Sequence, residues 1–194
     1  MTALLERSES LVQTMRFSLT MFERMIETGI LPEDARLELL DGQIVELPEI
    51  KQNHANCIKR LYDLLQGIFS SQADVYSQSP IRLPQDGRPL PDIFLIRSNA
   101  AAEQSPLPDD IYLLIEVAGS SLYQDRHMKS VLYARDKITE YWILNLEENQ
   151  LEVYRDPKNE RYQTSFTLQI GQLATCLAFP QDPIDWFSSL GGEK

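Results

Sequence analysis

The chain has 194 residues, of which 43% are hydrophobic and 24% are charged, values typical of one folded domain. Its 18 Lys and Arg residues against 29 Asp and Glu residues give a formal net charge of −11. This excess of acid argues against a broad nucleic-acid-binding surface, because phosphate contacts need clustered basic side chains. No apolar run is long enough to cross a bilayer, and the N-terminus lacks the pattern of a secretory signal. The two cysteines, Cys57 and Cys176, form no CxxC pair, so we expect a protein of the reducing cytoplasm.

The N-terminal part predicts an arm followed by a helix. Residues 1–16 predict a loosely held arm, and residues 17–194 a single domain. The segment from Thr20 to Glu23 matches a capping box, with Thr20 as the N-cap. The helix that it opens is expected to end near Gly29.

From residue 36 onward the pattern alternates between strands and helices. Two short alternating runs in 36–47 flank the pair Asp41-Gly42, which predicts a β-hairpin. Apolar residues at helical spacing predict a helix over 51–69. We therefore expect an α/β (α+β) fold, a mixed β-sheet flanked by α-helices. The other expected elements are strands at 75–83, 93–96, 111–118, 141–146, 151–154 and 162–168, with a helix at about 122–136.

The stretch YLLIEVAGSS is an apolar strand that contains one carboxylate, Glu116. A buried charge is costly unless something compensates it. Asp92 opens an earlier strand, and two carboxylates on neighbouring strands can share a divalent cation. The backbone carbonyl of Val117 is a candidate third ligand. Asp92, Glu116 and Val117 are therefore candidate ligands of Mg²⁺ or Mn²⁺.

The expected helix at 122–136 adds a positive charge. Asp125, Lys129 and Tyr133 fall within about 80° of one another around a helix axis. This stripe borders an apolar face that contains Met128, so we expect it at the edge of the core. A lysine ammonium near the end of the strand that carries the acid would favour a metal-bound hydroxide and stabilise charge that develops on a phosphate.

The same residues also have structural explanations. Asp92 would simply begin a strand after a proline, and Glu116 would pair with an arginine such as Arg82 or Arg97. An i, i+4 pair of opposite charge, such as the aspartate and lysine of the stripe, is common on exposed helix faces.

A zinc site is a further alternative. His54 and Cys57 lie three residues apart on one expected helix, and His127 or Cys176 would complete the ligand set. A core position for Cys57 and a surface or near-site position for His54 is the simpler explanation. The chain contains neither a phosphate-binding Gly-rich loop nor a GxSxG motif, so nucleotide-dependent enzymes and serine hydrolases are poor candidates.

Several ordered segments carry a family resemblance. PDIFLIR, YLLIEVAGSS and YQDRHMKSVLYARDKITEYWIL follow RLELLDGQIVELP and a helix that contains His54. Together they resemble the Uma-type family of restriction endonucleases, within the PD-(D/E)XK nuclease superfamily. The resemblance spans about residues 18–155. It implies a restriction-endonuclease-like core and Mg²⁺-dependent hydrolysis of phosphodiester bonds in DNA.

The resemblance also implies a set of catalytic residues. Asp92 corresponds to the Asp of the PD motif and Glu116 to the acidic residue of (D/E)XK. The lysine expected two residues later is replaced by Ala118, and Lys129 matches a lysine that the family places in the following helix. Glu38 matches an early acidic residue and is implied as an outer metal or water contact. The implied supporting residues are Asp125, Tyr133 and His54.

Two hypotheses of different classes follow. In the first, the protein is a metal-dependent endonuclease in which Asp92 and Glu116 hold the cation and Lys129 polarises the water or holds the phosphate. In the second, a catalytically weak or inactive homologue acts as a binding or regulatory module, which the strong negative charge favours. The aromatic strand Leu151–Tyr154 would then support a homodimer.

Overall fold

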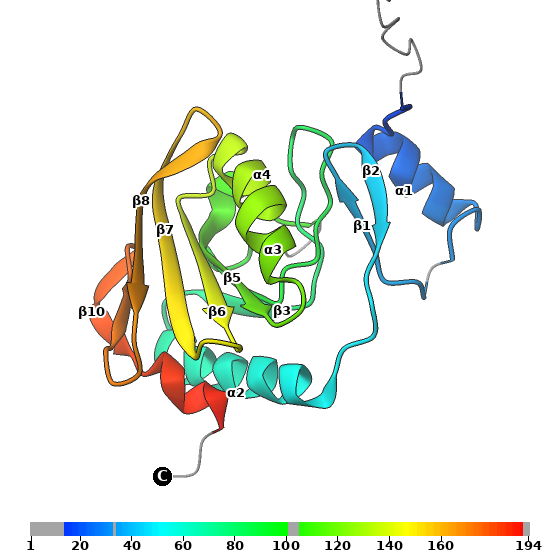
Figure 1. Cartoon of the computed structure of the whole chain (residues 1–194). Helices are drawn as coiled ribbons and strands as arrows, with labels where there is room; N and C mark the ends of the chain where they lie inside the picture. The colour runs from blue at the N-terminus through cyan, green and yellow to red at the C-terminus, as the bar shows by residue number, and fades with distance from the viewer. Residues whose placement is uncertain (1–13, 33, 101–104, 192–194) are drawn as a thin grey trace, which may run out of the picture.

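The computed structural model describes residues 14–32, 34–100 and 105–191. Most of the expected arm at 1–16 therefore lies outside the described residues. The described chain contains a central β-sheet, helices on both of its faces, and a small N-terminal unit beside it (Figure 1). This is the α+β architecture expected from the sequence, a mixed sheet flanked by helices.

The central sheet has six strands in the order β3-β4-β5-β6-β7-β8. Neighbouring strands are antiparallel except β5 and β6, which run parallel. A parallel pair needs a crossover connection, and the helical segment between β5 and β6 provides it (Figure 1). The strands are β3 (Asp74–Ser77), β4 (Ile93–Ile96), β5 (Ile111–Ala118), β6 (Glu140–Asn145), β7 (Gln150–Lys158) and β8 (Arg161–Leu168).

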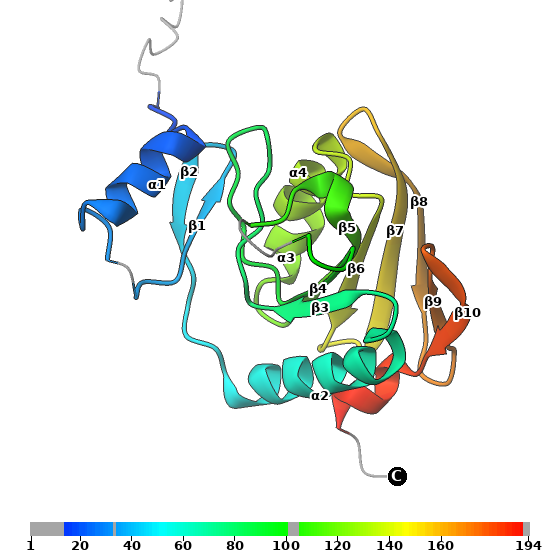
Figure 2. The ribbon, with the colours of Figure 1, turned by 180° about the vertical axis from the view of Figure 1, so that it is seen from behind.

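Each face of the sheet has its own apolar core, because successive side chains of a strand point to opposite faces. Ile115 lies on one face, in a cluster with the buried side of helix α2 (Gln52–Phe69). Leu114 lies on the other face, with Leu132 of helix α4 (Ser130–Arg135). The views from front and back show α2 and α4 on different sides of the strands (Figures 1 and 2). The central strands are therefore buried on both faces.

The expected hairpin at 36–47 is present as β1 (Leu37–Leu40) and β2 (Gln43–Glu46), which pair antiparallel. Asp41 and Gly42 have φ values of 50° and 73°. A type I′ turn requires positive φ at both central residues, and an Asp-Gly pair meets this requirement at low steric cost. The turn thus fixes the register of the hairpin.

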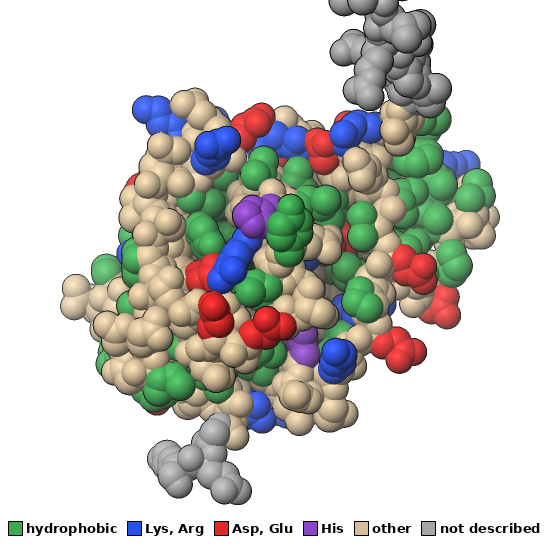
Figure 3. Space-filling model, viewed as in Figure 1, with side chains coloured by type: hydrophobic (Ala, Val, Ile, Leu, Met, Phe, Trp, Pro, Cys, Tyr) green, Lys and Arg blue, Asp and Glu red, His purple; other side chains and the backbone are tan. Residues whose placement is uncertain are grey.

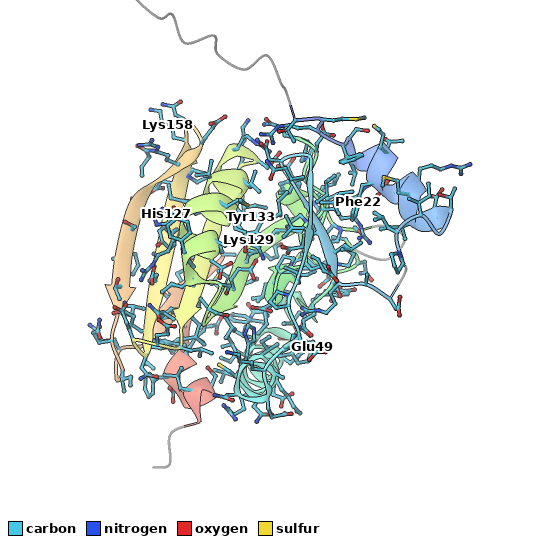
Figure 4. All side chains as sticks on the ribbon, turned by 45° about the vertical axis from the view of Figure 1, so that its right-hand side comes forward. Phe22, Glu49, His127, Lys129, Tyr133 and Lys158 are labelled. Carbon is cyan, nitrogen blue, oxygen red and sulfur yellow. The ribbon has the colours of Figure 1, made fainter. Side chains whose placement is uncertain are left out.

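Helix α1 (Leu19–Glu27) begins earlier than expected. Its N-cap is Ser18, whose hydroxyl accepts a hydrogen bond from a first-turn N–H at 3.2 Å. Thr20 lies inside the helix, and Glu23 forms an ion pair with a loop arginine instead of reaching back to the cap. The capping-box assignment was therefore wrong by two residues, because serine and threonine offer the same hydroxyl. Phe22 is buried between this helix and the hairpin (Figure 4).

The helix expected at 122–136 consists of three parts. α3 (Leu122–Gln124) leads into η2 (Asp125–Lys129), which is one turn of π-helix, and α4 completes the segment. A π-turn inserts an extra residue into the helical repeat and rotates the side chains that follow it. Met128 lies within this turn and points outward with 41% of its surface exposed, so the expectation that it belongs to the apolar face was wrong.

Two strand predictions also need correction. The strand expected at 75–83 ends at Ser77, because Gln78 adopts a positive φ of 48°. Leu151–Tyr154 is part of β7, which is covered on its edge by β8, so it is not an exposed surface for a homodimer. The homodimer itself stays a prediction. The C-terminal segment forms β9 (Ala174–Cys176), β10 (Phe179–Ile184) and η3 (Trp186–Leu190). No helix in the described ranges combines the length and apolar character needed to cross a membrane.

Candidate metal and phosphodiester site

The register of the central sheet brings the two predicted metal ligands together. β4 pairs antiparallel with β5, with Ile93 opposite Ile115. Continuing this register by one residue places Asp92 opposite Glu116. The Oδ2 atom of Asp92 accepts a hydrogen bond of 2.8 Å from the N–H of Val117, which holds this carboxylate against the backbone of β5. The sheet register thus brings together Glu116, within β5, and Asp92, the residue directly before β4.

His54 fixes the same carboxylate from a second direction. It lies in the first turn of α2, and its Nε2 atom is 3.2 Å from Oδ2 of Asp92. Because Oδ2 already accepts the Val117 N–H, both contacts fall on one oxygen. These two contacts leave the other oxygen of Asp92 unengaged, and they place His54 beside this candidate ligand.

Lys129 connects three acidic side chains. Its Nζ atom lies 3.0 Å from Oε1 of Glu116 and 3.1 Å from Oε1 of Glu38. Oδ1 of Asp125 is 4.0 Å away. Figure 4 shows Lys129 and Tyr133 on the side of the helix turned toward the β1–β2 hairpin, and His127 on the side toward β7 and β8. The π-turn therefore places the predicted stripe in the interior.

The hydroxyl of Tyr133 donates a hydrogen bond of 2.8 Å to Oε1 of Glu116. This oxygen therefore binds both the tyrosine and the Lys129 ammonium. The hydroxyl and the ammonium together fix the orientation of the carboxylate, and they contact only one of its two oxygens.

Glu38 comes from β1, so the hairpin contributes directly to the site. Its Oε1 atom accepts a hydrogen bond from the N–H of Leu90 at 2.8 Å and also contacts Lys129. Its Oε2 atom is buried and has no hydrogen-bond partner among the described residues, and the same is true of Oδ2 of Asp125. Buried carboxylate oxygens are rarely left without a partner, so each of these atoms indicates a missing positive charge or donor.

The buried acids of the site outnumber its buried basic side chains. Asp92, Glu116, Asp125 and Glu38 are all buried, and Lys129 is the one buried lysine or arginine among the described residues. Burial raises the pKa of Glu116 well above its ordinary value, and the neighbouring acids raise it further against the effect of Lys129. Burial likewise raises the pKa of Asp125 to about 6. Burial alone would lower the pKa of Lys129, but the surrounding carboxylates outweigh it and raise that pKa.

This donor set fits a hard divalent cation. Among the described residues, no three His, Cys, Asp or Glu side chains are grouped as ligands of one metal ion. Mg²⁺ does not need such a group, because it is usually bound through one or two carboxylates and completes its shell with water. Asp92 and Glu116 are two such carboxylates, and the excess of buried negative charge favours a cation beside them.

A cavity of about 500 Å³ opens onto these residues. Its lining includes Asp92, Glu116 and Lys129, together with the segment 47–51 between β2 and α2. The outer surface on the side shown in Figure 3 carries acidic and basic side chains mixed together, with no continuous basic area. The cavity is thus a local site on an acidic protein.

The structural alternatives for the acids are not supported. Arg82 pairs with Glu23, and Arg97 pairs with Asp110, so neither arginine neutralises Glu116. The partner of Glu116 is instead the lysine of the π-turn.

The zinc alternative is also not supported. Cys57 is buried in the core, with its thiol 3.9 Å from Oγ of Ser189. His54 contacts Asp92, while His127 packs against the ring of Tyr123 at 4.6 Å between centroids. The proposed ligands therefore have separate partners, and those in the described residues form no ligand group.

A family model with the description "Uma2: Putative restriction endonuclease" matches residues 19–184. The chain belongs to this family. The matched range includes Glu38, Asp92, Glu116 and Lys129. The family resemblance found in the sequence is thus confirmed.

Solved structures support the same fold. One similar chain is a crystal structure described as "a putative nuclease belonging to DUF820" from Anabaena variabilis ATCC 29413. It has a TM-score of 0.71 and 19% sequence identity, and the match covers 90% of this chain and 99% of that one. At this level of identity the likeness shows a shared fold. A search of curated proteins found no match.

Sequence reasoning missed two basic residues of the cavity. Arg36 and Lys51 both line it, one before β1 and the other as the N-cap residue of α2. Arg36 is the first residue of the segment RLELLDGQIVELP, and Lys51 lies at the start of the helix expected at 51–69. Neither position indicated a cavity, because the hairpin and α2 bring the two residues to it only in the folded chain.

Proposed function

We propose that this protein hydrolyses phosphodiester bonds in DNA with a divalent cation held by Asp92 and Glu116. The observation that carries the proposal is the meeting of these two acids with Lys129 at one wall of a cavity. Membership of a family described as restriction endonucleases supports the reaction class.

The carboxylates of Asp92 and Glu116 and the carbonyl of Val117 would bind Mg²⁺ or Mn²⁺. A bound cation of this kind would supply a Lewis acid and lower the pKa of a coordinated water. His54 and the Val117 N–H orient Asp92, and Tyr133 orients Glu116. These contacts keep both carboxylates in place before a substrate arrives.

Lys129 has the second role in the proposal. Its ammonium is held by Glu38 and Glu116 and faces the cavity, where it would stabilise negative charge that develops on a phosphate. Glu38 is a positioning residue here, because it fixes the ammonium from the hairpin side. This assigns a function to a lysine that lies outside the (D/E)XK segment.

The test is cleavage of both supercoiled plasmid DNA and single-stranded circular DNA with Mg²⁺ or Mn²⁺. We expect Asp92→Ala and Lys129→Ala each to lose cleavage by about 10²-fold or more, the scale for removing one charge-stabilising group. Lys59→Ala is the matched control, since Lys59 is exposed on α2 and its ion-pair partner within the described ranges is Asp63. Equal cleavage by all of these proteins would show that the activity belongs to a contaminant and would contradict the proposal.

A second candidate function is a homodimeric binding or regulatory module on the same fold. The net charge of −11 favours it, because such a surface repels nucleic acid. Calorimetric titration with Mn²⁺ separates the two candidates. Binding that is lost in Asp92→Ala supports the nuclease, whereas a folded protein without Mn²⁺ binding or cleavage supports the module.

A further inference from the structure

We infer that the site accepts a single-stranded or locally unpaired stretch of DNA and not an intact duplex. The inference rests on the proposed function and names its substrate class. Three features support it: the depth of the reacting groups, the walls of the cavity, and the small number of basic side chains around it.

The reacting groups lie deep. Glu116, Lys129 and Asp92 have only 3%, 5% and 8% of their surfaces exposed. A phosphate must reach them through a cavity of about 500 Å³, a size that suits a ligand of a few hundred daltons. An intact duplex is a rigid rod whose major groove alone is about 12 Å wide, and it would need an open channel. One nucleotide of a flexible strand can enter such a cavity.

The lining of the cavity comes from separate parts of the chain. The segment 47–51, of which Figure 4 labels Glu49, contributes to it, as do residues 119–121 and Leu146. Leu47, Ile50, Leu90 and Leu146 give the lining an apolar component. Apolar side chains suit the faces of nucleobases, which are hidden by stacking in a duplex and available in an unpaired strand.

Few basic side chains are available for phosphates. The lining contains Arg36, Lys51 and Lys129, and the last of these is already held by two carboxylates. About two phosphate contacts remain, fewer than the six to ten of a protein whose affinity for duplex DNA depends steeply on salt. For a single strand, two contacts predict a slope of about −1.4 in the logarithm of affinity against the logarithm of salt concentration. Six contacts to a duplex would give a slope of about −5.

The cleavage test uses three end-labelled DNA substrates of one sequence and length with Mn²⁺. They are a single strand, a perfect duplex, and a duplex with a central unpaired bubble. We expect the single strand and the bubble to be cut about tenfold faster than the duplex or more, with cuts confined to unpaired nucleotides. Duplex cleavage at an equal or higher rate would overturn the inference while leaving the proposed function standing.

A binding test separates this inference from a failure of the proposed function. Fluorescence anisotropy without divalent cation measures affinity for the single strand and the duplex over a range of salt concentrations. Tighter binding of the single strand with a slope near −1.4 supports the inference even if no substrate is cut. Tighter binding of the duplex, a slope near −5, or binding of neither DNA overturns it.

A matched pair of variants tests the location. Lys51→Ala removes one of the two proposed phosphate contacts and should reduce the salt slope for the single strand by about 0.7. Lys59→Ala lies on the same helix outside the cavity and should leave the slope unchanged. Thermal unfolding verifies that both variants are folded. An equal effect of the two substitutions would contradict binding in this cavity.

Discussion

Glu140 and Glu152 on the one hand, and the acids around Lys129 on the other, are all buried but are neutralised in different ways. Glu140 on β6 and Glu152 on β7 are buried and paired with arginines, and we call them the arginine-paired acids. Glu38, Glu116 and Asp125 surround Lys129, and we call them the lysine cluster. Both groups are taken out of water to a similar extent, so the difference between them lies in their partners.

The arginine-paired acids are fully satisfied. Glu140 accepts hydrogen bonds from the indole of Trp142, the guanidinium of Arg155 and the N–H of Leu177. Glu152 accepts several from Arg126, and others from the side chains of Tyr154 and Asn145. Each acid thus has an arginine of its own.

The lysine cluster has one cation for three acids. Oε2 of Glu38 and Oδ2 of Asp125 have no partner within the described chain. The pKa directions show the result: burial raises the pKa of Glu116, whereas the bonds from Arg126 and Tyr154 outweigh burial and lower the pKa of Glu152. Paired buried acids therefore belong to the scaffold, and the unneutralised ones mark the place where a cation is expected to bind.

The largest expected effect concerns the arginine-paired acids. Arg155→Ala would leave Glu140 fully buried without its counter-charge, which costs about 3–5 kcal/mol. Urea unfolding with and without Mn²⁺ measures the loss, and Mn²⁺ should not restore it, because this acid lies outside the cavity. The double variant Glu140→Leu with Arg155→Met is the control and should recover part of the stability. A loss below about 1 kcal/mol would remove the distinction between the two groups.

The next effect concerns the lysine cluster. A cation that binds only the folded state stabilises it by about 2.7 kcal/mol at one hundred times its dissociation constant. Thermal and urea unfolding at rising Mn²⁺ concentration should show this gain in the wild type and lose it in Glu116→Gln. Mn²⁺ stabilisation of equal size in both proteins would place the cation elsewhere.

The sheet, and the choice of Asp92 and Glu116 as candidate metal ligands, could be predicted from the sequence because both depend on local signals. The Asp41-Gly42 pair determines the hairpin turn, and the apolar runs determine most of the strands. Asp92 and Glu116 were recognisable because an acid in an apolar strand needs a partner. The family resemblance then identified Lys129 as that partner.

The remaining features depend on tertiary structure. The π-turn at 125–129 shifts the helical repeat, which a pattern of apolar residues does not specify. The pairing of Glu140 with Arg155 depends on the register between β6 and β7, and the fit of Arg36 and Lys51 around one cavity depends on three separate elements. The sequence therefore located the acids, but it did not show which basic side chains pair with them in the folded protein.

A smaller effect should appear as a pH dependence. The pKa of Asp125 is raised from 3.8 to about 6, so the folded state holds this proton more tightly than the unfolded chain. Stability should consequently fall as pH rises from about 4 to about 6 and then stay lower, which is opposite to the behaviour of a salt-bridged aspartate. Asp125→Asn removes this titration. The shift of about two pKa units corresponds to about 3 kcal/mol of stability that Asp125→Asn would gain at high pH. Burying the unsatisfied amide of the asparagine would take away about 1–3 kcal/mol of that gain.

We therefore expect Asp125→Asn to gain about 1 kcal/mol over the wild type at pH 8 and to lose that advantage at pH 4.5. Urea unfolding at the two pH values, without divalent cation, measures the difference. Glu152→Gln serves as the comparison, because the pKa of Glu152 is lowered and its removal should cost stability at pH 8. An advantage of Asp125→Asn that is the same at both pH values would show that Asp125 does not carry the excess charge.

The smallest effect is expected where an acid and a base pair in solvent. Nζ of Lys59 lies 2.6 Å from Oδ2 of Asp63 on α2, closer than the contact between Lys129 and Glu116, yet 73% and 56% of the two side-chain surfaces are exposed. Water screens this pair, so Lys59→Ala should change the free energy of unfolding by less than about 0.5 kcal/mol. The same measurement on Lys129→Ala should change by several times more in the absence of divalent cation. If the two lysines gave equal changes, burial would not distinguish the lysine cluster from an ordinary surface pair, and the excess charge would no longer point to a cation site.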